Sequence, residues 1–218
     1  TTVTLNPIAD TNDTTPTISG TGEPGSTITI SDGSTPLGTV TVQPDGTWTF
    51  TPTTPLSEGP HTINVSAQDP YGNTNTTSGT PAHDSEGPFV IDTSATATVD
   101  IKDDSNHDDM ISSVDNMTQT KLSGTIEAGG SITSLTVKDA VGNTITIPNT
   151  AITLNPDGTW SAIVDVTSLK DGTLTTTLSA QDALGNSAPV VSDTIEKDTV
   201  TTVTLNPIAD TNDTTPTI

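Results

Sequence analysis

The sequence contains no cysteine and no arginine, and five lysines stand against 27 acidic residues in a chain of 218 residues. The absence of cysteine excludes stabilisation by disulfides. The net charge of −22 makes nucleic acid an improbable partner, because binding phosphates requires clustered lysine and arginine. The same shortage of cations excludes binding to anionic membrane surfaces.

Aromatic residues and long apolar runs are also scarce. Aromatic residues make up 2% of the chain and all hydrophobic residues 29%, so any core is lean. No apolar stretch approaches the roughly 18 residues needed to span a bilayer, and we expect no direct membrane insertion. A lean core commonly needs additional stabilisation, and the surplus of carboxylates indicates bound metal rather than disulfides.

What the sequence does contain is alternating Thr, Val and Ile, interrupted at short intervals by Gly, Pro, Asn and Asp. This pattern predicts short β-strands joined by tight turns. In the first hundred residues we expect seven strands, at 3–6, 17–22, 27–31, 38–43, 47–51, 61–68 and 89–92. Seven alternating strands in this length predict an all-β fold of the immunoglobulin-like β-sandwich type.

The alternation also assigns faces to the larger side chains. It places Trp48 and Phe50 on one inward face, and Trp160 in an equivalent core position. His61 is expected on a strand as an exposed or edge residue. Tyr71 is expected in an exposed turn, with packing at a domain junction as its role.

The first 18 residues, Thr1–Ile18, are identical to the last 18, Thr201–Ile218, which gives a period of 200 residues. Inside that period "PDGTW" and "SAQDxxGN" each occur twice in the same order, so the period consists of two diverged copies of one unit. We therefore expect two tandem domains, at 1–93 and 94–199, followed by the start of a third at 200–218.

The motifs "ISGTxExG", "DGTW", "SAxDxxGN" and a closing "DT" resemble the bacterial Ig-like tandem repeats of giant type I-secreted adhesins, including RTX and biofilm-associated ones. The resemblance covers nearly the whole chain. It implies an extender role, in which modules hold a terminal ligand-binding region away from the cell. It also implies stiffening by Ca²⁺ and an extracellular location at the bacterial cell surface.

The densest acidic stretch, "DDSNHDDMISSVD", has the ligand spacing of an EF-type calcium loop, although the central glycine and the flanking helices are missing. The expected ligands are Asp104, Asn106, Asp108 and Asp115, with Asp103 and Asp109 as substitutes. A solvated acidic loop is the alternative. A shorter counterpart in the first unit contains Asp10, Asn12 and Asp13, for which Asx-turn chemistry is an equally simple explanation.

A second kind of calcium site is expected where consecutive domains join. In a seven-stranded sandwich, three loops cluster at the end where the preceding linker arrives, and their carboxylates would repel one another without a cation. For the second unit the set is Glu127, Asp182 and Asn186, with Asp92 from the linker. For the first unit it is Glu23, Asp69 and Asn73, and Asp198 is the linker residue for the next module. Asp45 and Asp157 belong to Asp-Gly pairs and are interpreted as turn residues, and "DxxGN" could itself be a hairpin turn.

No motif of a nucleophile elbow, zinc protease or phosphate-binding loop is present, so we expect no enzyme. The predicted function is a structural extender whose partners are neighbouring repeats of the same chain. The alternative is a module that binds glycan or host protein directly. The target of a distal adhesin region is not predicted.

Overall fold

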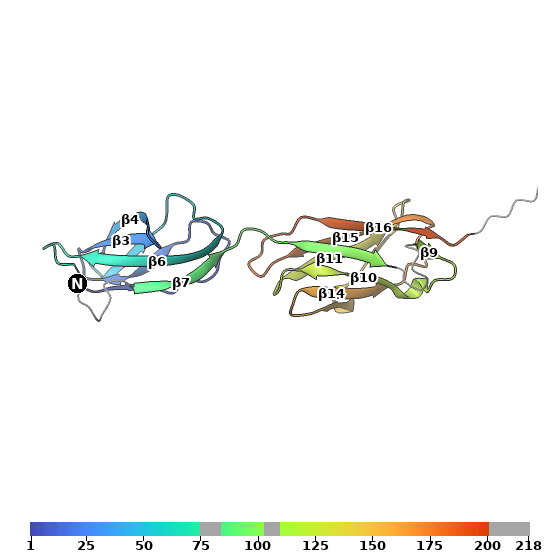
Figure 1. Cartoon of the computed structure of the whole chain (residues 1–218), viewed down its shortest axis with the longest axis horizontal. Coiled ribbons are helices and arrows are strands. Elements are labelled where there is room, and N and C mark those ends of the chain that lie inside the picture. Colours follow the sequence, from blue (N-terminus) through green and yellow to red (C-terminus); the bar gives the residue numbers. More distant parts are fainter. Residues whose placement is uncertain (75–83, 103–109, 201–218) are drawn as a thin grey trace, which may run out of the picture. The chain divides into compact units, whose positions relative to one another are not determined.

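A computed structural model describes residues 1–74, 84–102 and 110–200 of the chain (Figure 1). Contacts divide it into two compact units. The first contains Thr1–Thr96 and the loop Gln181–Ala188, and the second contains Ala97–Ala180 and the described residues from Pro189 onward. None of the described segments forms a helix long and apolar enough to cross a bilayer.

The first unit is built from two antiparallel sheets. One has the order β1-β2-β5, formed by Val3–Leu5, Ile18–Gly22 and Thr47–Phe50. The other has the order β4-β3-β6-β7, formed by Thr35–Thr41, Thr27–Asp32, Gly59–Gln68 and Asp84–Ile91. Inward residues of both sheets form one hydrophobic cluster, so the unit is a β-sandwich.

Trp48 is the largest side chain of this core and is 1% exposed. Its indole Nε1 donates a hydrogen bond of 3.1 Å to the carbonyl of Thr21, which satisfies the polar atom of the buried ring. Phe50, two residues along the same strand, is partly buried and packs against the same cluster. The alternation predicted for this strand is therefore confirmed.

The second unit repeats this architecture with two larger sheets. One has the order β13-β14-β10-β8, formed by Ile152–Leu154, Thr159–Val164, Thr120–Ile126 and Ala97–Lys102. The other has the order β12-β11-β15-β16-β9, formed by Thr144–Thr146, Ser131–Lys138, Gly172–Gln181, Val191–Asp198 and Met110–Ser112. Two 3₁₀ turns, Met117–Gln119 and Asn149–Ala151, lie between strands. Trp160, Leu122 and Leu135 are in the core.

In both units the segment after the first strand pairs in parallel with the last strand. In the second unit β9 lies parallel to β16, with Ile111 opposite Lys197. In the first unit an isolated parallel bridge joins Thr11 to Ile91. The early segment of each unit thus crosses from one sheet to the other, which is the topology expected of an immunoglobulin-like sandwich.

The glycine of the "SGT" motif is explained by the close approach of the neighbouring strand. A Cβ at Gly20 would lie 1.9 Å from the carbonyl oxygen of Thr4 and 2.7 Å from the Trp48 ring. At Gly124 it would lie 2.0 Å from the carbonyl oxygen of Thr98 and 3.0 Å from the Trp160 ring. A side chain is excluded at both positions by neighbouring backbone and the core tryptophan.

The prediction of an all-β, immunoglobulin-like fold is confirmed, and each of the seven segments predicted for the first unit overlaps a strand. Three strands begin earlier than predicted, β4 at Thr35, β6 at Gly59 and β7 at Asp84. The prediction for His61 is wrong, because this residue is 6% exposed. Its two ring nitrogens lie 2.6 Å from Oδ2 of Asp32 and 2.7 Å from the carbonyl oxygen of Ser57, and these two polar partners make its burial possible.

Candidate metal centre

The Asp-x-x-Gly-Asn sequence forms a closed turn at the end of β6. Oδ1 of Asp69 accepts hydrogen bonds from the backbone N–H groups of Tyr71 and Asn73, at 2.9 and 2.8 Å. The side-chain amide of Asn73 donates to Oδ2 of Asp69 over 2.7 Å, and this bond contributes most to holding the pKa of Asp69 below its usual value. Gly72 has a φ of +85°, a conformation that favours glycine.

The same turn follows β15, where Asp182 is 6% exposed. Its Oδ1 accepts from the N–H groups of Leu184 and Asn186, both at 2.8 Å. Burial opposes ionisation, but the hydrogen bonds led by that of the Asn186 side chain outweigh it, and the pKa of Asp182 is lowered. The carboxylate therefore keeps its negative charge at neutral pH.

Asp92 lies beside this second turn. The side-chain amide of Asn186 donates one hydrogen bond to Oδ2 of Asp182, at 2.6 Å, and one to the backbone carbonyl of Asp92, at 2.7 Å. Asp92 and Asp182 each bring a carboxylate oxygen to within 4.8 Å of the other. Two carboxylates at this separation repel each other, so the position favours a cation.

The predicted ligands differ in how much of their carboxylate the protein already uses. Asp182 accepts three hydrogen bonds, which leaves about one of its roughly four lone-pair directions for a metal ion. Oδ1 of Asp92 accepts one hydrogen bond, from the N–H of Ser94 at 3.1 Å. Asp92 therefore has more remaining capacity to bind a cation than Asp182 does.

The other linker aspartate and the two predicted glutamates also make contacts of their own. Asp198 ends β16 and accepts a hydrogen bond from the N–H of Val200 at 3.3 Å, in the same local pattern as Asp92. Glu127 directly follows β10, and its carbonyl accepts a hydrogen bond from the N–H of Gly130. Oε2 of Glu23 lies 3.7 Å from the backbone nitrogen of Thr1. The predicted pairing of Glu23 with Asp69 and Asn73 around an ion stays a prediction.

The acidic residues near the start of the first unit are used in local contacts. Oδ1 of Asp10 accepts a hydrogen bond of 2.7 Å from the N–H of Val90, which ties this segment to β7. Oδ1 of Asp13 accepts from the N–H and the hydroxyl of Thr15, as in an Asx turn. The turn chemistry considered as the alternative from the sequence is present at Asp13.

Most of the predicted EF-type loop lies outside the described residues, namely Asp103, Asp104, Asn106, Asp108 and Asp109. Its last predicted ligand, Asp115, is described and is 7% exposed. Oδ2 of Asp115 accepts from the N–H and the hydroxyl of Ser112, at 2.8 and 2.7 Å. Calcium binding by this loop therefore stays a prediction.

Asp45 and Asp157 close the two Asp-Gly turns, as the sequence suggested. Oδ1 of each accepts the N–H and the hydroxyl of the Thr two residues later, at 3.0 and 2.7 Å for Asp45 and at 3.0 and 2.6 Å for Asp157. The hydroxyl of that Thr contributes most to lowering the pKa of each aspartate. These residues have a structural role in the turns.

A third copy of the closed turn was missed by sequence reasoning, between β11 and β12. Asp139 is 3% exposed, its Oδ1 accepts from the N–H groups of Val141 and Asn143, and its Oδ2 accepts from the Asn143 side chain. Its Oδ2 also accepts a bond of 2.9 Å from the N–H of Lys170. The signal was available, because "DAVGN" has the same pattern as "DPYGN" and "DALGN".

The chain is similar to several solved structures. A tetra-tandem repeat from the extending region of a large adhesion protein is 30% identical, over 90% of this chain and 48% of that one, with a TM-score of 0.41. The BSP domain of a biofilm-associated protein is 20% identical, over 91% of this chain and 30% of that one, with a TM-score of 0.31. Fibronectin(III)-like modules of CbhA from Clostridium thermocellum are 15% identical, over 89% of this chain and 94% of theirs, with a TM-score of 0.35.

The chain spans about half of the first of these structures and less than a third of the second. No curated protein matches it. The family of bacterial Ig-like domains matches residues 9–93. The matched residues include β2 to β7 of the first sandwich.

Proposed function

We propose that this chain is an extender segment of a large secreted adhesin at the bacterial cell surface, in which tandem Ig-like sandwiches hold a distal ligand-binding region away from the cell. The observation that carries the proposal is the identity of Thr1–Ile18 with Thr201–Ile218. An identical repeat with a period of 200 residues is typical of an array of domains that serves to make a protein long. The partners of each module are then its neighbours in the chain.

We further propose that Ca²⁺ stiffens the joints of this array. The proposed ligands are Asp92, Glu127 and Asp182, with Asn186 as the residue that orients them. Support comes from the ionised state of Asp182 and from the short distance between the carboxylates of Asp92 and Asp182. Oxygen ligands of this type suit Ca²⁺, and an ion bound by residues of two modules would convert binding free energy into resistance to bending.

The net charge of −22 supports the same role for the ion. Without counterions the acidic surface favours expansion of the chain through self-repulsion, and divalent cations reduce this effect where carboxylates are closest. We expect the acidic loop from Asp103 to Asp115 to bind a further ion. Both kinds of site would make stability depend on the concentration of free Ca²⁺.

The extender role is tested by removing one 200-residue period from the whole adhesin and measuring the length of the surface fibre and the binding of its ligand. A shorter fibre with unchanged binding by the isolated protein is the expected result. Loss of binding without a change in length would contradict the extender role.

The calcium mechanism is tested by thermal melts and small-angle scattering of the chain, first with Ca²⁺ and then with a chelator. The chelator should lower the Tm and change the maximum dimension. Glu127→Gln should reduce the response to Ca²⁺. Asp139→Asn alters the same kind of turn outside the proposed ligand set, so it should lower the Tm and leave the response to Ca²⁺ intact. An identical melt and dimension with and without the chelator would exclude stiffening.

A further inference from the structure

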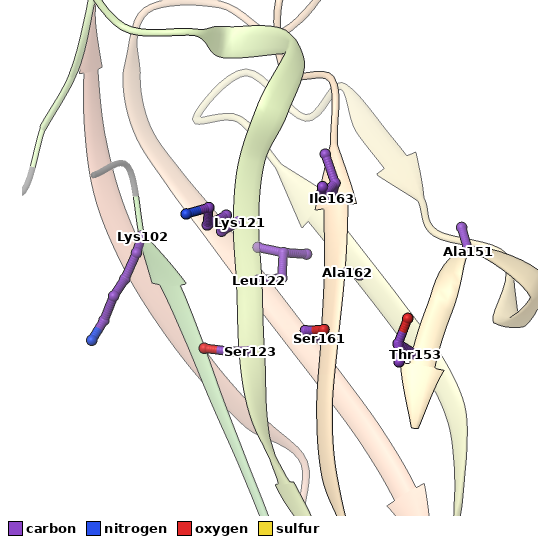
Figure 2. Close-up of a pocket in the computed structure, with 9 residues that line it drawn as sticks. All are labelled: Lys102, Lys121, Leu122, Ser123, Ala151, Thr153, Ser161, Ala162 and Ile163. Carbon is purple, nitrogen blue, oxygen red and sulfur yellow. The ribbon is translucent and has the colours of Figure 1, made fainter. Parts of the chain in front are cut away.

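The outer face of the sheet β13-β14-β10-β8 carries a groove with a volume of about 560 Å³ (Figure 2). Successive side chains of a strand point to opposite faces, so residues two apart share this face. The registers place Thr153 opposite Ser161 and Ser161 opposite Ser123. The hydroxyl side chains of three adjacent strands thus form one row across the sheet.

The next row on the same face contains Ile163 opposite Lys121, and Lys121 opposite Lys102. Serine and threonine are short, whereas lysine and isoleucine are long, so the hydroxyl row forms a depression beside the longer side chains. Figure 2 shows these residues on their strands, with Lys121 and Ser123 on β10 and Ser161 and Ile163 on β14. The groove therefore combines cationic, hydroxyl and aliphatic groups.

The charge of this groove is opposite to that of the chain. Two of the five lysines of a chain with net charge −22 stand directly opposite each other on neighbouring strands. Like charges in this cross-strand position are destabilising. Lys102 has an ion pair of 2.9 Å with Asp100, whereas the Lys121 ammonium has no hydrogen-bond or ion-pair partner in the part of the chain that the structure describes. An anion beside Lys121 would reduce the repulsion that remains between the two ammonium groups.

The remaining groups are available to a ligand. Among the described residues, the hydroxyls of Ser123, Thr153 and Ser161 have no intramolecular hydrogen-bond partner. Ile163 is 53% exposed, an aliphatic surface beside the two lysines. The backbone N–H and C=O groups of β10 and β14 are used in ladders with strands on both sides, so a peptide cannot dock here by adding a strand.

We propose that this groove binds a sugar chain that bears carboxylates, such as a uronic acid oligosaccharide. The ammonium group of Lys121 pairs with a carboxylate, the serine and threonine hydroxyls exchange hydrogen bonds with sugar hydroxyls, and Ile163 contacts the C–H face of a sugar ring. A highly charged polyanion is disfavoured, because the field of a protein with net charge −22 repels it.

The test is an NMR titration of the full 218-residue chain with trigalacturonic acid, and with its methyl ester as the uncharged match. A chelator is present throughout, so that calcium bridging by the sugar does not contribute. The acid should shift the amide signals of β10 and β14, and the ester should bind at least about tenfold more weakly. Equal binding of acid and ester, or no shift with the acid at millimolar concentration, would overturn the proposal.

Variants distinguish binding of the acid in this groove from a general electrostatic attraction of the acid to any lysine side chain. Lys121→Gln should weaken binding of the acid about tenfold or more, and Lys121→Arg, which keeps the charge, should retain most of it. Lys138→Gln, on the other sheet, makes the same change in net charge and should have no effect. Because Lys121→Gln removes a repulsive pair, we expect its Tm not to fall. An unchanged or higher Tm would show that the variant is folded. Unchanged binding by Lys121→Gln, or preference for a tetra-aspartate peptide over the sugar, would show the proposal to be wrong.

Discussion

The side-chain amide of Asn143 donates a hydrogen bond of 2.7 Å to Oδ2 of Asp139, and this bond closes the turn between β11 and β12. The backbone N–H of Asp139 donates to the carbonyl of Asn143 across the same turn, at 3.0 Å. Burial opposes ionisation of Asp139, but the N–H groups of Lys170, Asn143 and Val141 and the Asn143 amide lower its pKa to about 2. The ionised carboxylate is thus part of the folded structure.

This turn predicts loss of stability in acid. The folded pKa of Asp139, about 2, lies below the ordinary aspartate value of 3.8, so its contribution is fully present above pH 3.8 and is lost as the pH falls toward 2. We expect the Tm of the second unit to fall over this range. In Asp139→Asn the Tm at pH 7 should be lower and the decline between pH 4 and 2 smaller. Calorimetry at several pH values measures both, with Asp100→Asn as the control. An unchanged acid profile in Asp139→Asn would contradict this role.

His61 predicts the opposite dependence in the first unit. Burial favours the neutral ring, but hydrogen bonds to Asp32 and to the carbonyl of Ser57 outweigh it, and the pKa of His61 is raised above 6.5. Because both ring nitrogens face acceptors, the geometry favours the doubly protonated cation. Its stabilisation is present below pH 6.5 and is lost as the pH rises through the folded pKa.

The test for His61 uses the residue that the second unit has at this position. Leu174 corresponds to His61, since each lies eight residues before the aspartate of its closed turn. His61→Leu should lower stability at pH 5 by about 1–3 kcal/mol, because Asp32 loses a charged donor. The variant should also lose the decline between pH 6 and 9. Chemical denaturation at pH 5, 7 and 9 measures this, and a wild-type stability that rises over that range would refute the prediction.

Gly124→Ala tests the close approach of two strands. The added methyl group would lie 2.0 Å from the carbonyl oxygen of Thr98, and strand β10 would have to move away from β8. We expect a loss of about 1–3 kcal/mol or more from overpacking. Ser123→Ala, at the neighbouring half-buried position on the outer face, should change stability by less than about 0.5 kcal/mol. Denaturant melts compare the two, and equal effects would show that the "SGT" glycine is not needed for packing.

The strands and core tryptophans could be predicted because alternation and turn residues are local signals. Trp48 and Trp160 follow Asp-Gly turns at fixed positions, and both are buried as expected. His61 could not be placed, because its burial depends on Asp32, a partner 29 residues away in the chain. Lys197 is similar: it is 4% exposed on β16, where its ammonium donates to the carbonyl of Leu169 over 2.6 Å. Buried polar residues depend on distant partners that a pattern does not show.

The candidate site was predictable only in part, because its motif is a local signal whereas its role depends on contacts that the sequence does not show. The sequence identified Asp182 and Asn186 as a pair but left their role open between ligands and turn residues. The hydrogen bonds between them show that they form the turn. Whether the remaining oxygen capacity binds Ca²⁺ depends on affinity, which neither spacing nor geometry fixes.

The carboxylate of Glu58 holds the residues that follow the last strand of the first unit. Glu58 accepts hydrogen bonds from the hydroxyls of Thr93 and Ser94, at 2.9 and 2.8 Å. In the second unit Asp171 accepts from the N–H and hydroxyl of Thr199, which follows the linker aspartate as Thr93 does. A carboxylate directly before the penultimate strand, Glu58 or Asp171, thus fixes the residues just after the last strand. This contact gives the "DT" motif a structural reason.

Glu58→Ala should release these residues without unfolding the sandwich. The hydrogen bonds are exposed, so the loss of global stability should stay below about 1 kcal/mol. The backbone order parameters of Thr93 and Ser94 should fall from the range of rigid backbone, about 0.85, toward 0.6. ¹⁵N relaxation measures this directly. Glu58→Gln keeps one acceptor oxygen and should give an intermediate value. If Thr93 and Ser94 stay as rigid in Glu58→Ala as in the original chain, the order of this segment comes from its backbone contacts and not from the Glu58 carboxylate.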